Sequence, residues 1–196
     1  MDALLKLDAN TVIWLNQGIG RVTALDEVAY LLVSDYFIPL MISFGLLGLW
    51  FSGKDAASRH RNQRAVLQAA ISLAFANLAV LVMNHYYFRD RPFTEYRLAN
   101  LLYEASDSSF PAHPAAISFA AAMGTWLGNR RAGVVLFGLA GLWGLVRIYS
   151  GLFYPSDVVA GGLIGIAVSC AVSLALHLIE PLQTWVLQGA RFLHLA

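Results

Sequence analysis

Five long apolar segments constrain what this chain can fold into more than any other feature of its sequence. A helix that crosses the ~30 Å hydrocarbon core of a bilayer needs about 20 residues. The longer segments reach that length, and the shorter ones approach it when their ends extend into neighbouring loop residues. They are residues 31–51, 64–83, 114–127, 132–146 and 158–179. We therefore predict an all-α integral membrane protein, with a bundle of about five transmembrane helices in a single domain over residues 1–196.

The composition agrees with this prediction. Hydrophobic residues make up 58% of the 196 residues and charged residues only 13%. The mean hydropathy is +0.61, and the charges cluster between the apolar segments, as a bilayer requires. A net charge of +1 argues against nucleic acid as a partner. The single cysteine, Cys170, lies in an apolar segment, so an internal disulfide is excluded.

Two shorter helices are expected beside the bundle. Residues 1–20 carry a broken helical stripe of apolar residues that includes Trp14, and they lack the positively charged start of a secretory signal. We predict that they form a helix lying in the headgroup zone. The connection over residues 84–113 is long for a structureless loop, which predicts a short helix within it, at residues 93–103.

Proline and glycine residues inside the apolar segments predict local features of the bundle. Pro39 lies within the first segment, where a kink is tolerable because adjacent helices can satisfy the freed carbonyl. Small residues at short helical spacings let helix backbones approach each other closely. Such spacings occur at Gly138, Gly141 and Gly144 in the fourth segment and at Gly161 and Gly165 in the fifth. Ordinary glycine usage in membrane helices explains these spacings equally well.

The basic residues predict how the bundle is oriented in the membrane, because cytoplasmic loops carry an excess of lysine and arginine. Here they gather in the loop after the first segment and in the loop after the third, at Lys54, Arg59, Arg61, Arg64, Arg130 and Arg131. We expect a bacterial-type plasma membrane protein with a cytoplasmic carboxyl terminus. The amino terminus and the loops at residues 84–113 and 147–157 then all face the other side.

Three short motifs lie in those two non-cytoplasmic loops. They are Arg91-Pro92, Ser109-Phe110-Pro111-Ala112-His113-Pro114, and Arg147 followed ten positions later by the last residue of Tyr154-Pro155-Ser156-Asp157. Together they resemble the signature of the type 2 phosphatidic acid phosphatase and haloperoxidase superfamily. The likeness covers residues 84–162, and its most specific part is 147–161.

This resemblance implies a helical bundle that removes phosphate from lipid phosphates or pyrophosphates without a metal or a cofactor. In such a family a histidine of the third motif attacks phosphorus, and a histidine of the second motif protonates the departing alcohol. Arginines, a lysine and a serine stabilise the transition state. By resemblance, Arg91 and Arg147 are phosphate-binding residues, since guanidinium groups match phosphate oxygens. Asp157 would orient a histidine ring. For a single arginine, snorkelling toward lipid headgroups remains the alternative.

The sequence departs from the family's pattern at four polar positions. An ungapped alignment places Asn84 on the lysine, Ala112 on the serine, Pro114 on the acid histidine and Phe153 on the nucleophile. Phenylalanine cannot form a bond to phosphorus. His113 lies one position from the acid histidine and is the remaining candidate for a catalytic role. Alternatively, it caps the third predicted span or bonds water.

Three functional hypotheses follow. The first is a phosphatase-like membrane protein that keeps a pocket formed by Arg91, Arg147 and Asn84, and binds or handles an anionic lipid phosphate without hydrolysis. The second is an active lipid phosphate or polyprenyl pyrophosphate phosphatase that uses His113. The third is a structural subunit of a larger membrane complex, or a homo-oligomer. No spacing of histidines and carboxylates in the sequence favours a metal site.

Overall fold

The computed structural model describes residues 2–99 and 106–178, which form helices joined by loops and contain no strand. The helices are α1 (Asp2–Asn16), α2 (Thr23–Val33), α3 (Phe37–Phe51), α4 (Ala56–Tyr86), α5 (Pro92–Glu95), α6 (His113–Gly128), α7 (Arg130–Tyr149) and α8 (Pro155–Leu178). Each of the five apolar segments is helical over most of its length. The predicted all-α fold class is confirmed.

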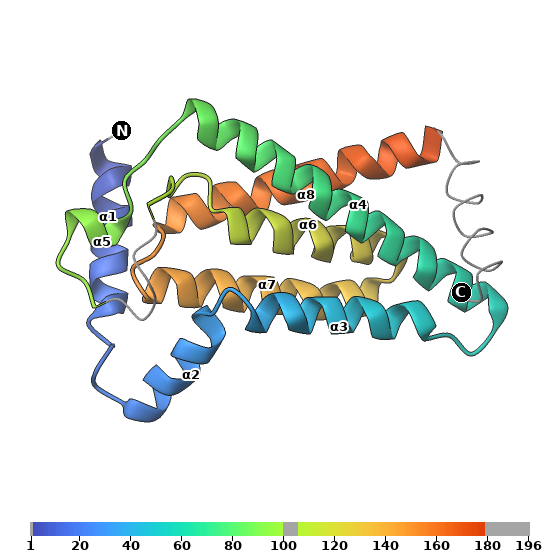
Figure 1. Cartoon of the computed structure of the whole chain (residues 1–196), viewed down its shortest axis with the longest axis horizontal. Helices are drawn as coiled ribbons and strands as arrows, with labels where there is room; N and C mark the ends of the chain where they lie inside the picture. Colours follow the sequence, from blue (N-terminus) through green and yellow to red (C-terminus); the bar gives the residue numbers. More distant parts are fainter. Residues whose placement is uncertain (1, 100–105, 179–196) are drawn as a thin grey trace.

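Helix α6 lies at the centre of the bundle and packs against α4, α7 and α8 (Figure 1). Its small residues, among them Ala116, Ala120 and Ala121, are fully buried. Helix α3 lies along α7, whereas α1 crosses one end of the bundle (Figure 1). That crossing has the geometry that a helix in the headgroup zone would need, although its place in a membrane stays a prediction.

Helices α4, α7 and α8 are each long and apolar enough to cross a membrane, and α2 with α3 would form one further span bent by 60°. Helix α6 has 16 residues, about 24 Å at 1.5 Å per residue, which is less than the ~30 Å of a hydrocarbon core. By length and composition the described residues therefore contain three candidate spans, or four with the bent pair, where the sequence predicted about five.

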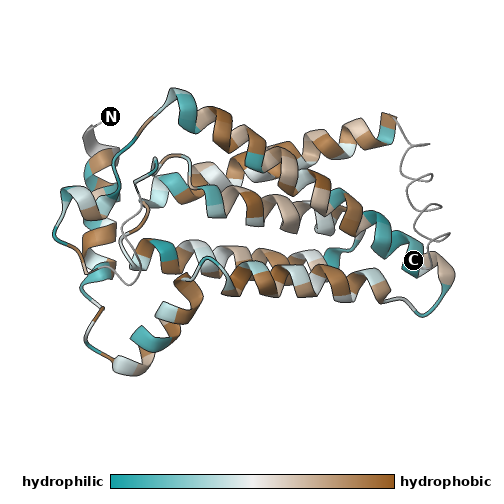
Figure 2. Ribbon diagram, in the orientation of Figure 1, coloured by the Kyte–Doolittle hydropathy of each residue, from teal (hydrophilic) through white to brown (hydrophobic). Residues whose placement is uncertain are grey.

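Large apolar side chains cover the outside of the bundle. Figure 2 shows hydrophobic residues along the middle of the long helices and hydrophilic residues concentrated toward the ends. Phe44, Leu78, Val135 and Leu163 are among the large hydrophobic side chains with more than half of their surface exposed. An apolar exterior on this scale is stable in lipid but not in water. The protein is an integral membrane protein.

The first apolar segment is not one continuous helix, because residues 34–36 separate two helices within the predicted span over residues 31–51. Helix α2 ends at Val33, and α3 begins at Phe37 after a turn in which the backbone N–H of Tyr36 donates to Ser34 Oγ at 3.1 Å. Pro39 lies in the first turn of α3, where its missing N–H leaves no intrahelical bond unmade. The turn places Asp35 at the corner between the two helices.

The predicted helix at residues 93–103 is shorter in the structure. Helix α5 covers Pro92–Glu95, and residues 96–99 are not helical. The Asn16 side chain of α1 donates to the carbonyl of Ala99 at 2.8 Å and accepts from its N–H at 2.9 Å. The backbone of Ala99 is thus bonded to α1 and not to a helical neighbour. Residues 100–103 of the predicted helix lie outside the described residues.

Helices α6 and α8 are in backbone contact at two glycines of the fifth segment. A Cβ atom at Gly161 would lie 2.4 Å from the carbonyl oxygen of Ala112, and one at Gly165 would lie 2.2 Å from that of Ala116. The predicted close approach therefore exists here. At Gly138 and Gly141 an added Cβ would meet nothing within 4 Å, so the prediction is wrong for them. Gly144 is close to a Val158 methyl, at 2.7 Å.

We expect Gly165→Ala to lower the thermal unfolding midpoint in detergent, because the new methyl group would push α6 and α8 apart. Overpacking of this kind costs about 1–3 kcal/mol. Gly138→Ala is the matched control in α7 and should leave the midpoint unchanged or raise it, since alanine is favoured over glycine in a helix by up to about 1 kcal/mol. Equal midpoints for the two variants would contradict the close approach of α6 and α8.

Candidate functional site

A cavity of about 360 Å³ lies where helices α3, α6 and α7 meet the loops that precede α5, α6 and α8. This volume is within the range of roughly 300–1,000 Å³ that is typical of small-molecule sites. The lining residues are Asp35, Pro39, Arg91, Asp107, His113, Pro114, Ile117, Trp143, Arg147, Leu152 and Phe153. Residues from all three sequence motifs therefore line one cavity.

Arg91 and Arg147 both line this cavity, and both are almost fully buried, with 5% and 4% of their surface exposed. Arg91 is the residue before the first turn of α5, and Arg147 is in the last turn of α7. A buried guanidinium is always charged and needs partners for its five donors. The structure thus brings together the two side chains that the resemblance assigns to phosphate.

Each of the two arginines forms an ion pair with an aspartate at the cavity. Arg91 Nη2 is 2.8 Å from Asp107 Oδ1, and its Nε and Nη1 donate to the carbonyls of Asp107 and Leu152. Arg147 Nη2 donates to Asp35 Oδ1. Neither aspartate was a candidate from the sequence. Asp35 gave a usable signal, as a lone carboxylate at the edge of an apolar segment, whereas Asp107 gave none.

Aromatic rings complete the surroundings of the arginines. The Arg91 guanidinium carbon lies 4.3 Å from the ring centroid of Phe153, which is 2% exposed. The Arg147 guanidinium lies 5.1 Å from the Trp143 ring. Both distances are within the range of a cation–π interaction. The position that the resemblance gives to the nucleophile is therefore occupied by an apolar ring that packs on a buried cation.

His113 is the first residue of α6 and lines the cavity. Its Nε2 lies 2.5 Å from the side-chain oxygen of Asn77 on α4. Because an amide oxygen only accepts hydrogen bonds, this contact makes Nε2 the nitrogen that carries a proton. Asn77 was missed by sequence reasoning, although an amide inside an apolar segment is a signal for a buried polar contact.

The other predicted positions are divided between the cavity and its surroundings. Pro114 lines the cavity, whereas Ala112 is fully buried and donates its backbone N–H to the carbonyl of Asp157 at 3.0 Å. Asn84 is not among the lining residues. It lies seven residues beyond Asn77, a distance of about 10 Å along the axis of α4, and therefore past the level of His113.

Asp157 connects the second and third motifs through hydrogen bonds. Among the described residues, none of its hydrogen-bond partners is a histidine. Its Oδ1 accepts from Arg89 Nη1 at 2.5 Å, and its Oδ2 accepts from Ser109 Oγ and from the backbone N–H of Tyr154 at 3.1 Å. The residue is fully buried. In this structure the carboxylate that would orient a histidine instead holds the second and third motifs together.

Arg89 extends this network to α1. Its Nη2 lies 3.2 Å from Asp8 Oδ2, its Nη1 donates to Ser156 Oγ at 2.9 Å, and its guanidinium lies 4.0 Å from the Tyr154 ring centroid. Burial opposes the charge, yet the carboxylates of Asp157 and Asp8 raise the pKa of Arg89 above its usual range. The sequence analysis did not single out Arg89 as a site residue.

The phenol of Tyr154 is a donor in the same region. Burial and the neighbouring Glu95 carboxylate raise the pKa of Tyr154 well above its usual range. The phenol is therefore protonated, and it donates to Glu95 Oε2 at 2.9 Å. This bond connects α5 to the loop that leads into α8.

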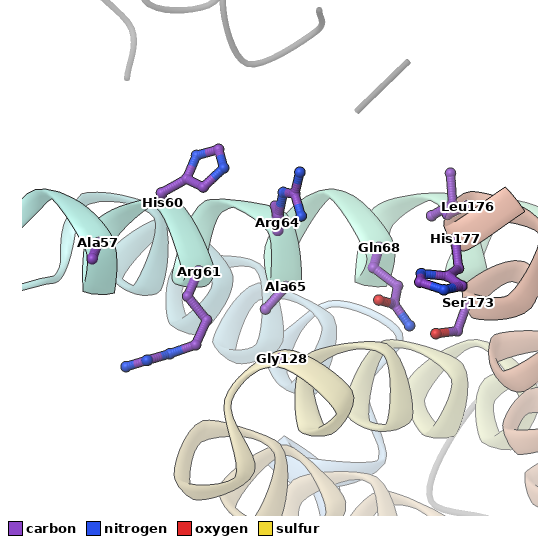
Figure 3. Close-up of a pocket in the computed structure, with 10 residues that line it drawn as sticks. All are labelled: Ala57, His60, Arg61, Arg64, Ala65, Gln68, Gly128, Ser173, Leu176 and His177. Atoms are coloured by element: carbon purple, nitrogen blue, oxygen red, sulfur yellow. The ribbon is translucent and has the colours of Figure 1, made fainter. Parts of the chain in front are cut away.

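A second polar pocket, of about 350 Å³, lies at the opposite end of the bundle, between α4 and α8 (Figure 3). Its lining includes His60, Arg61 and Arg64 from α4 and Ser173 and His177 from α8. His60 and His177 therefore lie at the end of the bundle opposite to Arg91 and Arg147. Among the residues that the structure describes, no cluster of histidine, cysteine and carboxylate groups could hold a metal ion.

Comparisons with known proteins identify the family. The model of the PAP2 superfamily matches residues 65–179. The undecaprenyl-diphosphatase BcrC of Bacillus subtilis is 33% identical over 129 residues, covering 63% of this chain and 61% of that protein. The putative undecaprenyl-diphosphatase YbjG of Escherichia coli is 31% identical over 143 residues, which is 70% of each chain. The chain belongs to the PAP2 superfamily of membrane lipid phosphatases.

Two solved structures share the fold. One is the PAP2-type phosphatidylglycerolphosphate phosphatase of Bacillus subtilis, with a TM-score of 0.61, 20% identity and coverage of 88% of this chain and 86% of that chain. The other is Aquifex aeolicus LpxE, with a TM-score of 0.64, 23% identity and coverage of 85% and 94%. The helical arrangement around the cavity is therefore that of PAP2 membrane phosphatases.

We expect Asp157→Asn to destabilise the protein by about 3 kcal/mol, because it removes one of the two carboxylates that compensate the charge of Arg89 and breaks a buried ion pair. Arg89 would keep only Asp8 as a carboxylate partner. Thermal unfolding in detergent measures the effect. Asp90→Asn removes an exposed carboxylate from the same loop as Arg89 and should change stability by less than about 0.5 kcal/mol. A similar small change for both variants would show that Asp157 does not hold the motifs together.

Proposed function

We propose that this protein binds the anionic phosphate group of a membrane lipid in the cavity between Arg91 and Arg147 and does not hydrolyse it. The observation that carries the proposal is the presence of two buried arginines in one cavity that has Phe153 at the nucleophile position. The names of two relatives, both undecaprenyl-diphosphatases, support a lipid phosphate as the ligand class.

The two arginines supply what a phosphate needs. Guanidinium groups present planar, forked donors that match phosphate oxygens, and charge-assisted hydrogen bonds are about twice as strong as neutral ones. Arg147 Nε is buried and has no hydrogen-bond partner among the described residues. Both arginines therefore offer phosphate charge, and Arg147 also offers remaining hydrogen-bonding capacity.

The absence of hydrolysis rests on the chemistry of the lining side chains. A covalent step requires an atom with a lone pair that can attack phosphorus, and the ring of Phe153 has none. Pro114 has no proton to give a leaving group. Asp157 is engaged by Arg89 and Ser109. Loss of a nucleophile lowers rates by orders of magnitude, because the groups of such a site act as a unit.

His113 supports a second candidate function, an active phosphatase, because its imidazole lines the same cavity. The second candidate is the weaker one for a physical reason. A nucleophilic imidazole is activated by a carboxylate that stabilises the cation formed, whereas Nε2 of His113 contacts the neutral amide of Asn77.

We also propose that the cavity faces the non-cytoplasmic side of the membrane and that the carboxyl terminus is cytoplasmic. The basic residues Arg59, Arg61 and Arg64 at the start of α4 and Arg130 and Arg131 at the start of α7 support this orientation. The starts of α4 and α7 lie at the opposite end of the bundle from the end of α7 and the start of α6, which contribute Arg147 and His113 to the cavity (Figure 1). A lipid headgroup would then enter from the outer leaflet.

We expect Arg91→Ala and Arg147→Ala each to weaken binding of vanadate and of a short-chain phosphatidic acid by about tenfold or more, since a hydrogen bond to a charged group contributes about 1.5–3 kcal/mol. Calorimetric titration of the purified protein in detergent measures this. Arg21→Ala removes an exposed arginine that does not line the cavity and should leave binding unchanged. Undiminished binding in the cavity variants would count against the proposal.

The same purified protein should release no inorganic phosphate from short-chain phosphatidic acid above a protein-free blank. Release that disappears in a His113→Ala variant would contradict the proposal and establish the second candidate function. Phosphate release is measured by a colorimetric assay on the full chain, so binding and turnover are read on one sample.

We expect a variant with Phe153→His, Pro114→His and Ala112→Ser to release phosphate from phosphatidic acid in a vanadate-sensitive reaction. Positions 153 and 114 line the cavity, so both introduced imidazoles would lie near Arg91 and Arg147. The matched control carries Phe153→Gln in place of Phe153→His, because glutamine is polar but cannot form a phosphohistidine. A triple variant that binds vanadate as the parent does, yet shows no release, would mean that the cavity no longer has the geometry for attack.

A further inference from the structure

We propose that the cavity selects a zwitterionic phospholipid headgroup, in which one phosphodiester binds the two arginines and one ammonium binds the two aspartates. This inference rests on the proposed function and adds the class of ligand. The aspartates Asp35 and Asp107 become specificity-determining residues. They favour a ligand of zero net charge and disfavour the doubly charged phosphate monoesters.

The charges of the described side chains that line the cavity cancel. Arg91 and Arg147 contribute two positive charges, and Asp107 and Asp35 contribute two negative charges at hydrogen-bonding distance from them. Of the described residues that line the cavity, His113 is the one further titratable side chain. A site whose fixed charges already sum to zero gains least from a ligand with a large net charge.

A phosphate monoester carries a charge of about −1.5 to −2 at neutral pH, because its second pKa is ~6. Such a ligand would replace the carboxylates at the guanidinium groups and then lie beside two displaced negative charges. Like charges at such short range repel, and the exposure of Asp35 and Asp107 to solvent reduces this repulsion without removing it. A phosphodiester carries a single negative charge, so it creates less repulsion, and an attached ammonium removes the remainder.

The four charged groups lie at different depths in the cavity. The side chains of both arginines are 5% exposed, whereas those of Asp35 and Asp107 are 39% and 64% exposed. The cations are therefore deep and the anions are closer to the surface. A headgroup that enters with its phosphate at the arginines would leave its ammonium, which lies further along the headgroup, at the level of the aspartates.

The deep end of the cavity has donors that its present partners do not satisfy. Arg147 Nε and Trp143 Nε1 are buried and have no hydrogen-bond partner among the described residues, and both side chains line the cavity. Buried donors are nearly always paired in folded proteins. Phosphate oxygens at Arg147 would supply acceptors at this end, while the carboxylate of Asp35 turns toward the ammonium.

The experiment compares three short-chain lipids with identical acyl chains by calorimetric titration of the full chain in detergent. We expect phosphatidylethanolamine to bind most tightly, phosphatidylglycerol less tightly and phosphatidic acid least tightly. In a variant with Asp35→Asn and Asp107→Asn, phosphatidic acid should gain at least about tenfold in affinity, equivalent to about 1.4 kcal/mol, and phosphatidylethanolamine should lose affinity. Asp90→Asn, which changes an exposed loop carboxylate outside the cavity, should leave the order unchanged.

The outcomes separate this inference from the proposed function. If the parent protein binds phosphatidic acid as tightly as phosphatidylethanolamine, and Arg91→Ala abolishes both, the inference is overturned and the proposed function stands. If none of the three lipids binds, both are overturned. The order of the three binding affinities is measured on the parent protein and needs no variant. The inference can therefore be tested even if the double variant does not fold.

Discussion

The buried carboxylate of Asp157 is the group on which the geometry of the cavity depends. It accepts hydrogen bonds from Arg89, Ser109 and the backbone of Tyr154, which belong to two loops separated by the whole of α6 and α7. An uncompensated buried charge costs several kcal/mol, so the fold is stable only when these loops meet. Their meeting brings Arg91, two residues beyond Arg89, to the same cavity as Arg147.

Once the loops have met, the cavity must accommodate two buried guanidinium groups. The structure does so with Asp107 and Asp35 and with the rings of Phe153 and Trp143. The same features define what the cavity can do. Phe153 packs on Arg91 at the position that the resemblance gives to the nucleophile. In the function that we propose, the aspartates set the charge that an incoming ligand has to match.

The positions of most helices could be predicted from the sequence, because apolar segments of this length have one stable form in a bilayer. The errors occurred where a single polar contact competes with the helix. Ser34 bonds the turn that separates α2 from α3, and Asn16 bonds the backbone of Ala99 beyond the short helix α5. The close approach of glycines was found at Gly161 and Gly165 but not at Gly138, because glycine spacing does not reveal which face of a helix meets a neighbour.

By itself the sequence determined that the protein lies in a membrane, that it is helical and that its motifs resemble those of PAP2 phosphatases, since hydropathy and motif spacing are local properties of the chain. Only the tertiary structure decided which carboxylates neutralise the arginines and which side chain contacts His113. Asp35 is 112 residues from Arg147, and Asn77 is 36 residues from His113. Such pairs form because buried charges and polar groups need partners, and folding alone determines which partners come within reach.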